Sequence, residues 1–342
     1  MTSRERVRAA LEFRTPDRAP RDLWALTWVH LFAKDKQEQV RREYPVDMQG
    51  VGALGPSDRS RDYTGRKGRY VDEWGAVWEV GEDGMAGEVK VPPLADWSAL
   101  ATFQPPWEML TRADWNAVAR AQEENLKGPN KFLMGSCSLR PFERLQFLRG
   151  TENLFLDMAW DTAEFHRLRE MVHDFFLQEL QGWVRTPVDA VFFMDDWGSQ
   201  QALLIAPEMW RALFKPLYRD YCDLARRAGK KVFFHSDGHI AAIFPDLVEI
   251  GIDAVNSQLF CMDIEDLARR FKGRITFWGE IDRQHVLRGP AEGVRRAVGR
   301  VRRALDDGRG GVFAQCEWGP LSPAENIRAV FDAWLAPIES LP

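Results

Sequence analysis

Several features that would place a protein in a membrane, disulfide-rich or nucleic-acid-binding class are missing from this sequence of 342 residues. No uninterrupted apolar segment is long enough to span a bilayer, and Met1 to Arg6 lack the apolar core of a signal peptide. The four cysteines show no CxxC spacing, so we expect reduced thiols. The net charge of −5 gives no support for binding nucleic acid. These absences predict a cytoplasmic protein without a membrane or nucleic-acid partner.

Familiar catalytic and phosphate-binding signatures are missing as well. No glycine-rich phosphate loop follows an early strand, which argues against a nucleotide-binding open sheet. No nucleophile elbow, P-loop or kinase signature occurs. The apolar fraction of 45% and the charged fraction of 28% are nevertheless those of an ordinary globular enzyme. Tryptophan is abundant, with 14 residues, and some of these rings are candidates to line a pocket for a flat ligand.

Apolar runs alternate with helical patterns from Trp107 onward, which predicts a parallel sheet covered by helices on both faces. At least seven strand–helix units occur, and Val46–Val51 is a candidate eighth strand. Their number and the chain length favour a (β/α)8 TIM-type barrel over an open sheet. We expect one long helix at Pro207–Arg227. The expected strands are Leu23–Trp28, Lys131–Ser136, Asp189–Asp196, Val232–His235, Ala254–Asn256, Ile275–Glu280 and Gly311–Cys316.

Two N-terminal segments do not fit this alternation. Ser3 to Phe13 has helical spacing of apolar residues and predicts an N-terminal helical extension. Residues 57–106 are irregular and rich in glycine, proline and tryptophan, with a hairpin pattern at residues 69–80. This stretch lacks helices with which to build a core of its own. We therefore expect an insertion within a single barrel domain of residues 1–342.

The most informative stretch ends the expected strand at Val232–His235. An apolar, aromatic run finishes in His235 and Asp237, and residues i and i+2 of an extended chain point to the same side. Parallel strands deliver their carboxyl ends to one face of a barrel, where ligands bind. Glu280 and Cys316 occupy similar positions after other strands. Imidazole, carboxylate and thiolate are ligands that zinc accepts, so His235, Asp237, Glu280 and Cys316 are a candidate zinc site.

Each of these residues has a plain structural explanation as well. Asp237 precedes a glycine and suits a turn, and His235 could be a hydrogen-bonded histidine at a strand end. Cys316 could serve packing alone. Glu280 could pair with Arg283 or with Arg140.

Two further candidates follow other strands. Asp195 and Asp196 could bind substrate, act as a base or cap the following loop, and we take them as catalytic candidates. Arg140 could clamp a carboxylate at the pocket mouth or belong to a charged loop rim.

The chain resembles the uroporphyrinogen decarboxylase superfamily over nearly its whole length. The marks are spread from the start of the chain to its last helix, and they are more specific for the superfamily than for one reaction. They comprise Ser3–Val7, Pro16–Pro20, Asp195–Gly198, Pro207–Trp210, Phe214–Pro216, His235–Gly238, Phe277–Asp282 and Gly319–Ala329.

That superfamily holds two chemistries on a (β/α)8 barrel. True uroporphyrinogen decarboxylases need no metal and carry an arginine- and glycine-rich signature, which the corresponding Arg21–Trp28 lacks. The other branch comprises zinc-dependent methyltransferases that work with corrinoid proteins. His235 and Cys316 match the ends of their zinc motif, whereas Asp237 stands at the position of its middle cysteine. A carboxylate there makes the site harder and suits activation of an oxygen.

The resemblance therefore implies a zinc-dependent methyltransferase similar to the O-demethylases. It would cleave a methyl group from a small, methoxy-aromatic donor and pass it to a corrinoid carried by a partner protein, and family members are often homodimers. Arg140 and four tryptophans are the candidates to bind the donor: Trp24, Trp28, Trp197 and Trp278. Packing is an equal explanation for these rings. Two alternatives stay open, a metal-free tetrapyrrole decarboxylase and a non-catalytic binding protein on the same barrel.

Overall fold

Eight parallel strands form the centre of the computed structural model, which describes residues 1–342. Six of them make one sheet in the order β10-β9-β8-β7-β6-β2, and β1 pairs with β11. A hydrogen bond from Asp47 N to Arg21 O, 2.9 Å long, joins the β1 and β2 segments, and Phe277 bridges to Val312 between β10 and β11. The strands thus follow one another around a ring, and the predicted α/β barrel class is confirmed. Their bounds are β1 Arg21–Ala25, β2 Met48–Val51, β6 Phe132–Ser136, β7 Ala190–Met194, β8 Lys231–Ser236, β9 Ala254–Ser257, β10 Thr276–Phe277 and β11 Ala314–Trp318.

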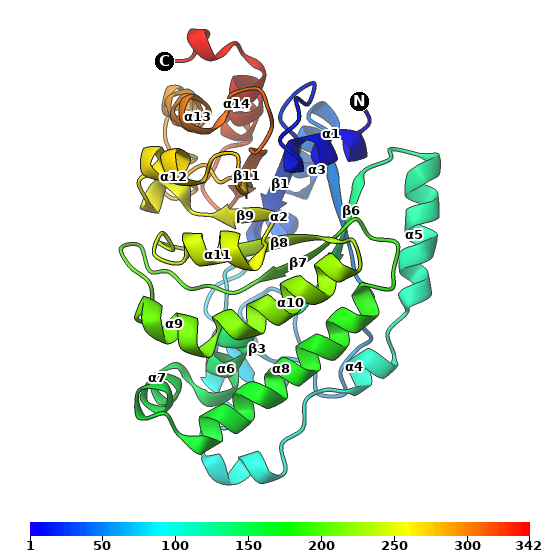
Figure 1. The fold of residues 1–342 in the computed structure, drawn as a ribbon, viewed down its shortest axis with the longest axis vertical. Helices are drawn as coiled ribbons and strands as arrows, with labels where there is room; N and C mark the ends of the chain where they lie inside the picture. The colour runs from blue at the N-terminus through cyan, green and yellow to red at the C-terminus, as the bar shows by residue number, and fades with distance from the viewer.

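Helices surround these strands, and both chain termini lie at the top of the view in Figure 1. None of the helices combines the length and the apolarity that crossing a bilayer requires. The helices are α1 Ser3–Leu11, α2 Thr27–Phe32, α3 Lys34–Glu43, α4 Glu108–Thr111, α5 Trp115–Lys127, α6 Pro141–Arg149, α7 Thr151–Trp160, α8 Ala163–Trp183, α9 Pro207–Leu213, α10 Lys215–Arg227, α11 Phe244–Ile250, α12 Ile264–Phe271, α13 Ala291–Leu305 and α14 Ala324–Leu335, with short 3-10 turns at Trp97–Ala101, Leu259–Cys261 and Ile338–Ser340.

Three expected elements have different bounds in the structure. The first strand ends at Ala25, where its pairing with β11 ends, so Trp28 lies in helix α2 instead. The expected helix at Pro207–Arg227 is two helices, because Pro216 has no N–H to continue a helical ladder and opens α10 instead. The strand expected at Ile275–Glu280 keeps only its first part, since Gly279 has a φ of 79° and turns the chain.

The irregular segment before α4 contains a small antiparallel sheet. Its strands are β3 Gly68–Val71, β4 Val77–Val80 and β5 Glu88–Val91, so the expected hairpin is confirmed and gains a third strand. The turn between β3 and β4 carries Trp74, which is buried and meets the Phe175 ring of α8 edge-on at 4.8 Å. The small sheet is therefore anchored to the helical layer of the barrel.

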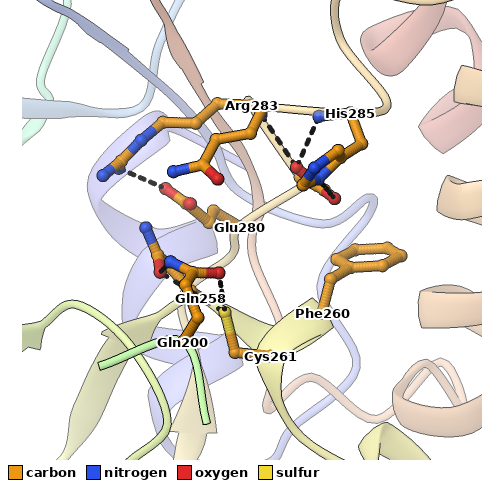
Figure 2. Close-up of a pocket in the computed structure, with 9 residues that line it drawn as sticks. Gln200, Gln258, Phe260, Cys261, Glu280, Arg283 and His285 are labelled. Atoms are coloured by element: carbon orange, nitrogen blue, oxygen red, sulfur yellow. Dashed lines mark hydrogen bonds and ion pairs between the residues drawn. The ribbon is translucent and has the colours of Figure 1, made fainter. Parts of the chain in front are cut away.

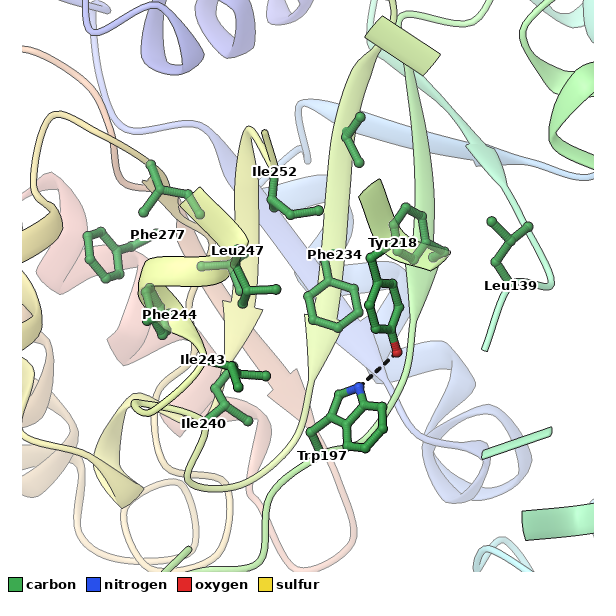
Figure 3. Packing of buried hydrophobic residues seen from close by; sticks show 14 of the residues in the cluster. Leu139, Trp197, Tyr218, Phe234, Ile240, Ile243, Phe244, Leu247, Ile252 and Phe277 are labelled. Atoms are coloured by element: carbon green, nitrogen blue, oxygen red, sulfur yellow. Dashed lines mark hydrogen bonds between the residues drawn. The ribbon is translucent and has the colours of Figure 1, made fainter. Parts of the chain in front are cut away.

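Two hydrophobic cores lie on opposite faces of the strands. The inner core fills the barrel and includes Phe233, whereas the next residue, Phe234, belongs to the outer core between strands and helices. Figure 3 shows part of the outer core, with Phe234 beside Tyr218 of α10. Because side chains of a strand alternate between faces, this parity fixes which residues at the strand ends can reach the barrel mouth. His235 lies two residues after Phe233, so its side chain is on the same face of the strand and points into the barrel.

Helix α1 closes the amino-terminal end of the barrel. Val7, Ala10 and Leu11 join the inner core, where Phe313, the residue before β11, is also buried. Two buried carboxylates at the starts of strands hold the helix from its polar side. Arg4 Nε donates to Asp189 Oδ1 at 2.8 Å, and Arg6 Nη1 donates to Asp47 Oδ1 at 2.7 Å. The opposite, carboxyl-terminal end of the barrel is left for the site.

Glu179 on α8 is a buried carboxyl group that links this helix to the loop after β6. It accepts hydrogen bonds from the Ser138 backbone N–H at 2.7 Å, from the Ser138 hydroxyl and from Trp183 Nε1 at 3.1 Å. Burial raises the pKa of Glu179 from 4.5 to about 7, even though these donors oppose the shift.

We expect Glu179→Gln to be more stable than the parent at pH 8 and to lose this advantage at pH 5. Since the folded-state pKa lies above the unfolded value, the parent loses up to roughly 3 kcal/mol of stability as pH rises through this interval. Glutamine keeps the acceptor for the N–H groups, donates to the Ser138 hydroxyl and does not titrate. Thermal unfolding at both pH values tests this, with the exposed Glu170→Gln of the same helix as control. A parent-like pH dependence in Glu179→Gln would contradict it.

Candidate functional site

His235 at the end of β8 has its ring fixed by the neighbouring strand. Its Nδ1 lies 2.6 Å from Asn256 Oδ1 of β9, and Asn256 Nδ2 donates to the Trp278 carbonyl. That second bond orients the amide so that its oxygen faces His235, and the Nδ1 atom of the histidine must therefore carry the hydrogen. His235 Nε2 is left to face the barrel mouth. This is the arrangement in which metal-binding histidines are held by a neighbouring acceptor.

Two carboxylates face His235 Nε2. Asp196 Oδ1 lies 3.4 Å from it and Asp237 Oδ1 lies 3.6 Å from it. The three ligand atoms all lie within 4.8 Å of one another. In a tetrahedral zinc site with bonds of about 2.0–2.1 Å, ligand atoms are separated by roughly 3.3 Å. The spacing of this group is therefore close to what a zinc ion requires.

Contact between two loops brings Asp196 and Asp237 together. Gly198 N donates to Asp237 O at 3.1 Å, and Asp237 N donates to Asp196 Oδ1 at 2.8 Å. Gly238 has a φ of 80°, and a Cβ atom there would lie 2.1 Å from Gly198 O. Glycine at this position is thus required both by backbone conformation and by the close approach of the loops.

The charge state of His235 shows that the group attracts positive charge. Burial disfavours the imidazolium, yet the hydrogen bond and charge of Asp196, together with the charge of Asp237, raise the pKa of His235 to about 9. The same contact with His235 lowers the pKa of Asp196 against the effect of burial. A histidine held among carboxylates in a cleft is a candidate functional group on electrostatic grounds.

Arg283 supplies a second positive charge beside the group. Its guanidinium contacts three carboxylates: Asp237 with Nη2–Oδ2 at 2.5 Å, Glu280 with Nη1–Oε2 at 3.4 Å, and Glu317. Figure 2 shows Arg283 extending toward Glu280, which lines a small cavity of about 190 Å³. Burial raises the pKa of Glu280 to about 8, although Arg283 opposes the shift. Arg283 therefore pairs with the candidate ligand Asp237 as well as with Glu280 and Glu317, and Glu280 lies next to the candidate ligands.

Cys316 is not part of this group. It is fully buried in the outer core, whereas the next residue, Glu317, reaches Arg283 at the barrel mouth. Strand β11 extends to Trp318, so successive side chains alternate between its two faces. Cys316 points outward to the helices, and Glu317 points into the barrel. Burial raises the pKa of the Cys316 thiol, which keeps it protonated. The structure thus brings together two of the four expected ligands, His235 and Asp237, adds Asp196, and places the Cys316 thiol elsewhere.

The neighbouring acids Asp195 and Asp196 have separate roles because they point in different directions. Asp195 is fully buried and accepts from Phe142 N at 2.7 Å and Glu143 N at 2.8 Å, which are N–H groups of the first turn of α6. It also accepts from the Tyr218 hydroxyl at 2.5 Å. Asp195 therefore caps a helix, and only Asp196 of this pair reaches the candidate ligands.

The four candidate tryptophans also differ in whether they lie near the candidate ligands. The Trp24 ring lies 5.1 Å from the His235 ring and 5.1 Å from Trp278, and both indoles donate to Asp22. Trp278 is fully buried beneath the site. Trp197 belongs to the outer core, where it donates to the Tyr218 hydroxyl (Figure 3). Trp28 packs against Phe32 within α2. Of the four rings, Trp24 is the one that is both near His235 and partly exposed.

Comparison with known proteins identifies the family of this chain. The sequence profile described as uroporphyrinogen decarboxylase (URO-D) matches residues 88–335, which is well over half of the chain. The chain belongs to the URO-D family. The predicted superfamily is thereby confirmed, over a stretch that includes strands β6 to β11. No curated protein sequence matches the chain.

Solved structures share this fold to different degrees. A methyltransferase from Methanosarcina mazei superposes with a TM-score of 0.71 and 14% sequence identity, covering 98% of each chain. An endo-beta-1,4-xylanase from Gloeophyllum trabeum reaches a TM-score of 0.46 at 10% identity, covering 97% of this chain and 100% of its own. At these identities the likeness concerns the fold.

Asp22, Asn256 and Glu317 belong to this site but were not among the residues predicted from the sequence, whereas Arg283 was expected as a partner of Glu280 and contacts it. Asp22 lies inside the barrel, where burial raises its pKa to about 6 against the effect of its indole donors. Asn256 lies in the short strand β9 and is paired with His235 in the strand register. Glu317 follows a predicted strand end by one residue. A strict inward–outward count along β11 would have selected Glu317.

Proposed function

We propose that this protein is a zinc-dependent methyltransferase, which cleaves a methyl group from a small methoxy-aromatic donor and passes it to a corrinoid protein. The observation that carries the proposal is the set of three converging ligand atoms on His235, Asp196 and Asp237. The URO-D family and the similarity in fold to a methyltransferase from Methanosarcina mazei support methyl transfer as the reaction.

The donor set fits zinc as the metal. His235 offers one nitrogen, and Asp196 and Asp237 offer one oxygen each, which leaves a further position for water or substrate as in catalytic zinc sites. This set takes Asp196 in place of the expected Cys316, and it contains no sulfur. When bound, zinc would supply Lewis-acid activation of an ether oxygen, for which an oxygen-rich site is suited.

The residues of the chain would prepare the donor and its leaving group. Asn256 fixes the tautomer of His235. Trp24 offers a partly exposed ring face beside His235 for an aromatic donor. In the proposed reaction the methyl–oxygen bond would break with its electron pair left on the phenolate oxygen. The methyl group would pass in the same displacement to the reduced corrinoid of the partner, which would supply the electron pair of the new bond.

We expect Asp196→Asn to lose zinc and Cys316→Ser to keep it. An amide oxygen is a much weaker ligand than a carboxylate, whereas the Cys316 thiol lies in the outer core. Each variant would be incubated with zinc, desalted and assayed for metal by mass spectrometry, and the parent should retain about one zinc per chain. Full zinc retention in Asp196→Asn together with loss in Cys316→Ser would contradict the ligand set. Release of CO2 from a carboxylated substrate in the presence of chelator would contradict methyl transfer itself.

A further inference from the structure

A second and larger cavity lies between the small antiparallel sheet and α6. It has a volume of about 710 Å³ and is lined by β3, β4, the turn between them, the preceding loop at residues 60–63, and α6 with the loop that leads into it. Pockets for small molecules in proteins usually measure about 300–1,000 Å³. The space is thus large enough for a substituted aromatic ring, and none of the candidate zinc ligands lines it.

Four aromatic side chains line this cavity from separate segments. Tyr70 and Trp78 stack with ring centroids 5.8 Å apart and an interplanar angle of 11°. Trp78 meets Phe147 of α6 edge-on at 4.6 Å, and Tyr63 meets Tyr70 at 4.8 Å. The indole of Trp78 is fixed by a hydrogen bond from Nε1 to Asp72 Oδ2 at 3.1 Å. Such a wall offers ring faces and edges against which a planar ligand can pack.

The arginines of the lining differ in how well they are paired. Arg144 is neutralised by Asp72 and Glu73. Arg61 has no carboxylate within 4.0 Å, and the one carboxylate near Arg140 is that of Glu143 at 3.8 Å. Burial raises the pKa of Glu143, which weakens it as a counter-ion. Arg61 and Arg140 are therefore available to an anion.

The lining holds as many acids as arginines, but none of its acids lies within 4.0 Å of Arg61 or Arg140. Asp62 lies on the exposed rim and has no cationic partner, so water screens its charge. Arginine binds carboxylates through two parallel N–H groups, and such charge-assisted hydrogen bonds are about twice as strong as neutral ones. Aromatic rings and free guanidinium groups together suit a ligand that is both flat and negatively charged.

Arg140 connects the cavity to the candidate metal site. It precedes α6, whose first turn is held by Asp195, the direct neighbour of the candidate ligand Asp196.

We propose that this cavity binds an aromatic carboxylate of the methoxybenzoate type, with its ring against Tyr70 and Trp78 and its carboxylate on Arg61 and Arg140. As a statement about the methyl donor, this inference rests on the proposed function. As a statement about binding, it stands on the cavity alone. It assigns specificity to the small antiparallel sheet, outside the barrel strands that hold the candidate ligands.

Isothermal titration calorimetry on chelator-treated protein tests the binding. The probe is 4-methoxybenzoate, compared with methoxybenzene, which lacks the carboxylate, and with 4-methoxycyclohexanecarboxylate, which lacks the aromatic ring. We expect each comparison compound to bind with a Kd at least about 10-fold higher than that of 4-methoxybenzoate. No heat of binding with 4-methoxybenzoate, or equal affinity for all three compounds, would overturn the inference.

Substitutions in the cavity lining test whether the ligand binds there. Arg61→Gln and Arg140→Gln are each expected to raise the Kd for 4-methoxybenzoate by about 10-fold. Tyr63→Leu, at an exposed position that tolerates replacement, should raise it by a smaller factor. Arg69→Gln is the matched control, because Arg69 belongs to the same sheet but pairs with Glu79 on the surface. Unchanged affinity in both Arg61→Gln and Arg140→Gln would overturn the assignment.

The binding assay and the methyl-transfer assay test different statements, so a negative result in one leaves the other intact. The calorimetry uses protein without zinc, so its outcome does not depend on turnover. Tight binding of 4-methoxybenzoate without methyl transfer would count against the proposed function alone. Methyl transfer from methoxybenzene, at a rate that Arg61→Gln leaves unchanged, would count against the aromatic carboxylate alone.

Discussion

His235→Ala is expected to lower the rate of methyl transfer by more than roughly 100-fold, since loss of a residue that only orients a metal ligand already costs about 10–100-fold. His235 provides the single nitrogen of the ligand set and is buried, so no other side chain can take its place. The two remaining carboxylates would also lose the positive partner that faces them. The rate would be measured as release of the phenol product, with zinc and the corrinoid protein in excess.

Two further variants make this result specific. His166→Ala removes a histidine that pairs with Asp161 on the surface, and it should leave the rate unchanged. Asn256→Leu keeps all three ligands but frees the His235 ring, so we expect zinc affinity to fall by about 10–100-fold. A folded His235→Ala protein that retains zinc and a parent-like rate would exclude the proposed site.

Asp195→Ala is expected to destabilise the protein by about 3 kcal/mol, because three buried donors lose their acceptor and each costs about 1–3 kcal/mol, partly offset by removing a buried acid. For a chain of this size, a loss of that order lowers the melting temperature by roughly 5–10 °C. Burial and the charge of Glu143 raise the pKa of Asp195 well above its usual value, so ionisation of Asp195 costs the parent stability and the loss in Asp195→Ala should become smaller as pH rises.

Asp196→Ala is the matched comparison, since it lies one residue along the same loop. Its side chain is partly exposed and supports no helix, so we expect a change in melting temperature of about 2 °C or less and loss of zinc. Differential scanning fluorimetry and metal analysis on the two variants measure both quantities. Equal melting temperatures for Asp195→Ala and Asp196→Ala would contradict the separation of their roles.

The sequence predicted the barrel and one half of the candidate site for a physical reason. Apolar runs that alternate with helices predict buried parallel strands, and the spacing of His235 and Asp237 keeps both side chains on the same side of an extended chain. The face of the strand to which Cys316 points was harder to predict. The strand was expected to end at Cys316, whereas β11 continues to Trp318, and a neighbouring residue faces the opposite side.

Residues whose role depends on distant helices were beyond local patterns. Asp195 caps α6, which lies some fifty residues earlier in the chain, and it is also held by Tyr218 of α10. Trp197 stacks on Phe142 of α6, with the two ring centroids 4.0 Å apart. A motif of two acids and a tryptophan after a strand gives no indication of which side chain faces the pocket, because helices from elsewhere in the chain decide it.

The way helix α1 closes the barrel also has a consequence for synthesis on the ribosome. Its apolar face rests on an inner core that includes Phe313, and Gly311 N donates to Ala10 O at 2.8 Å. Helix α1 therefore finds part of its binding surface only when the segment that leads into β11 has left the exit tunnel. Until then Val7, Ala10 and Leu11 have no complete partner surface. Assembly of this barrel thus joins distant segments of the chain late, and the apolar face of α1 stays exposed in the meantime.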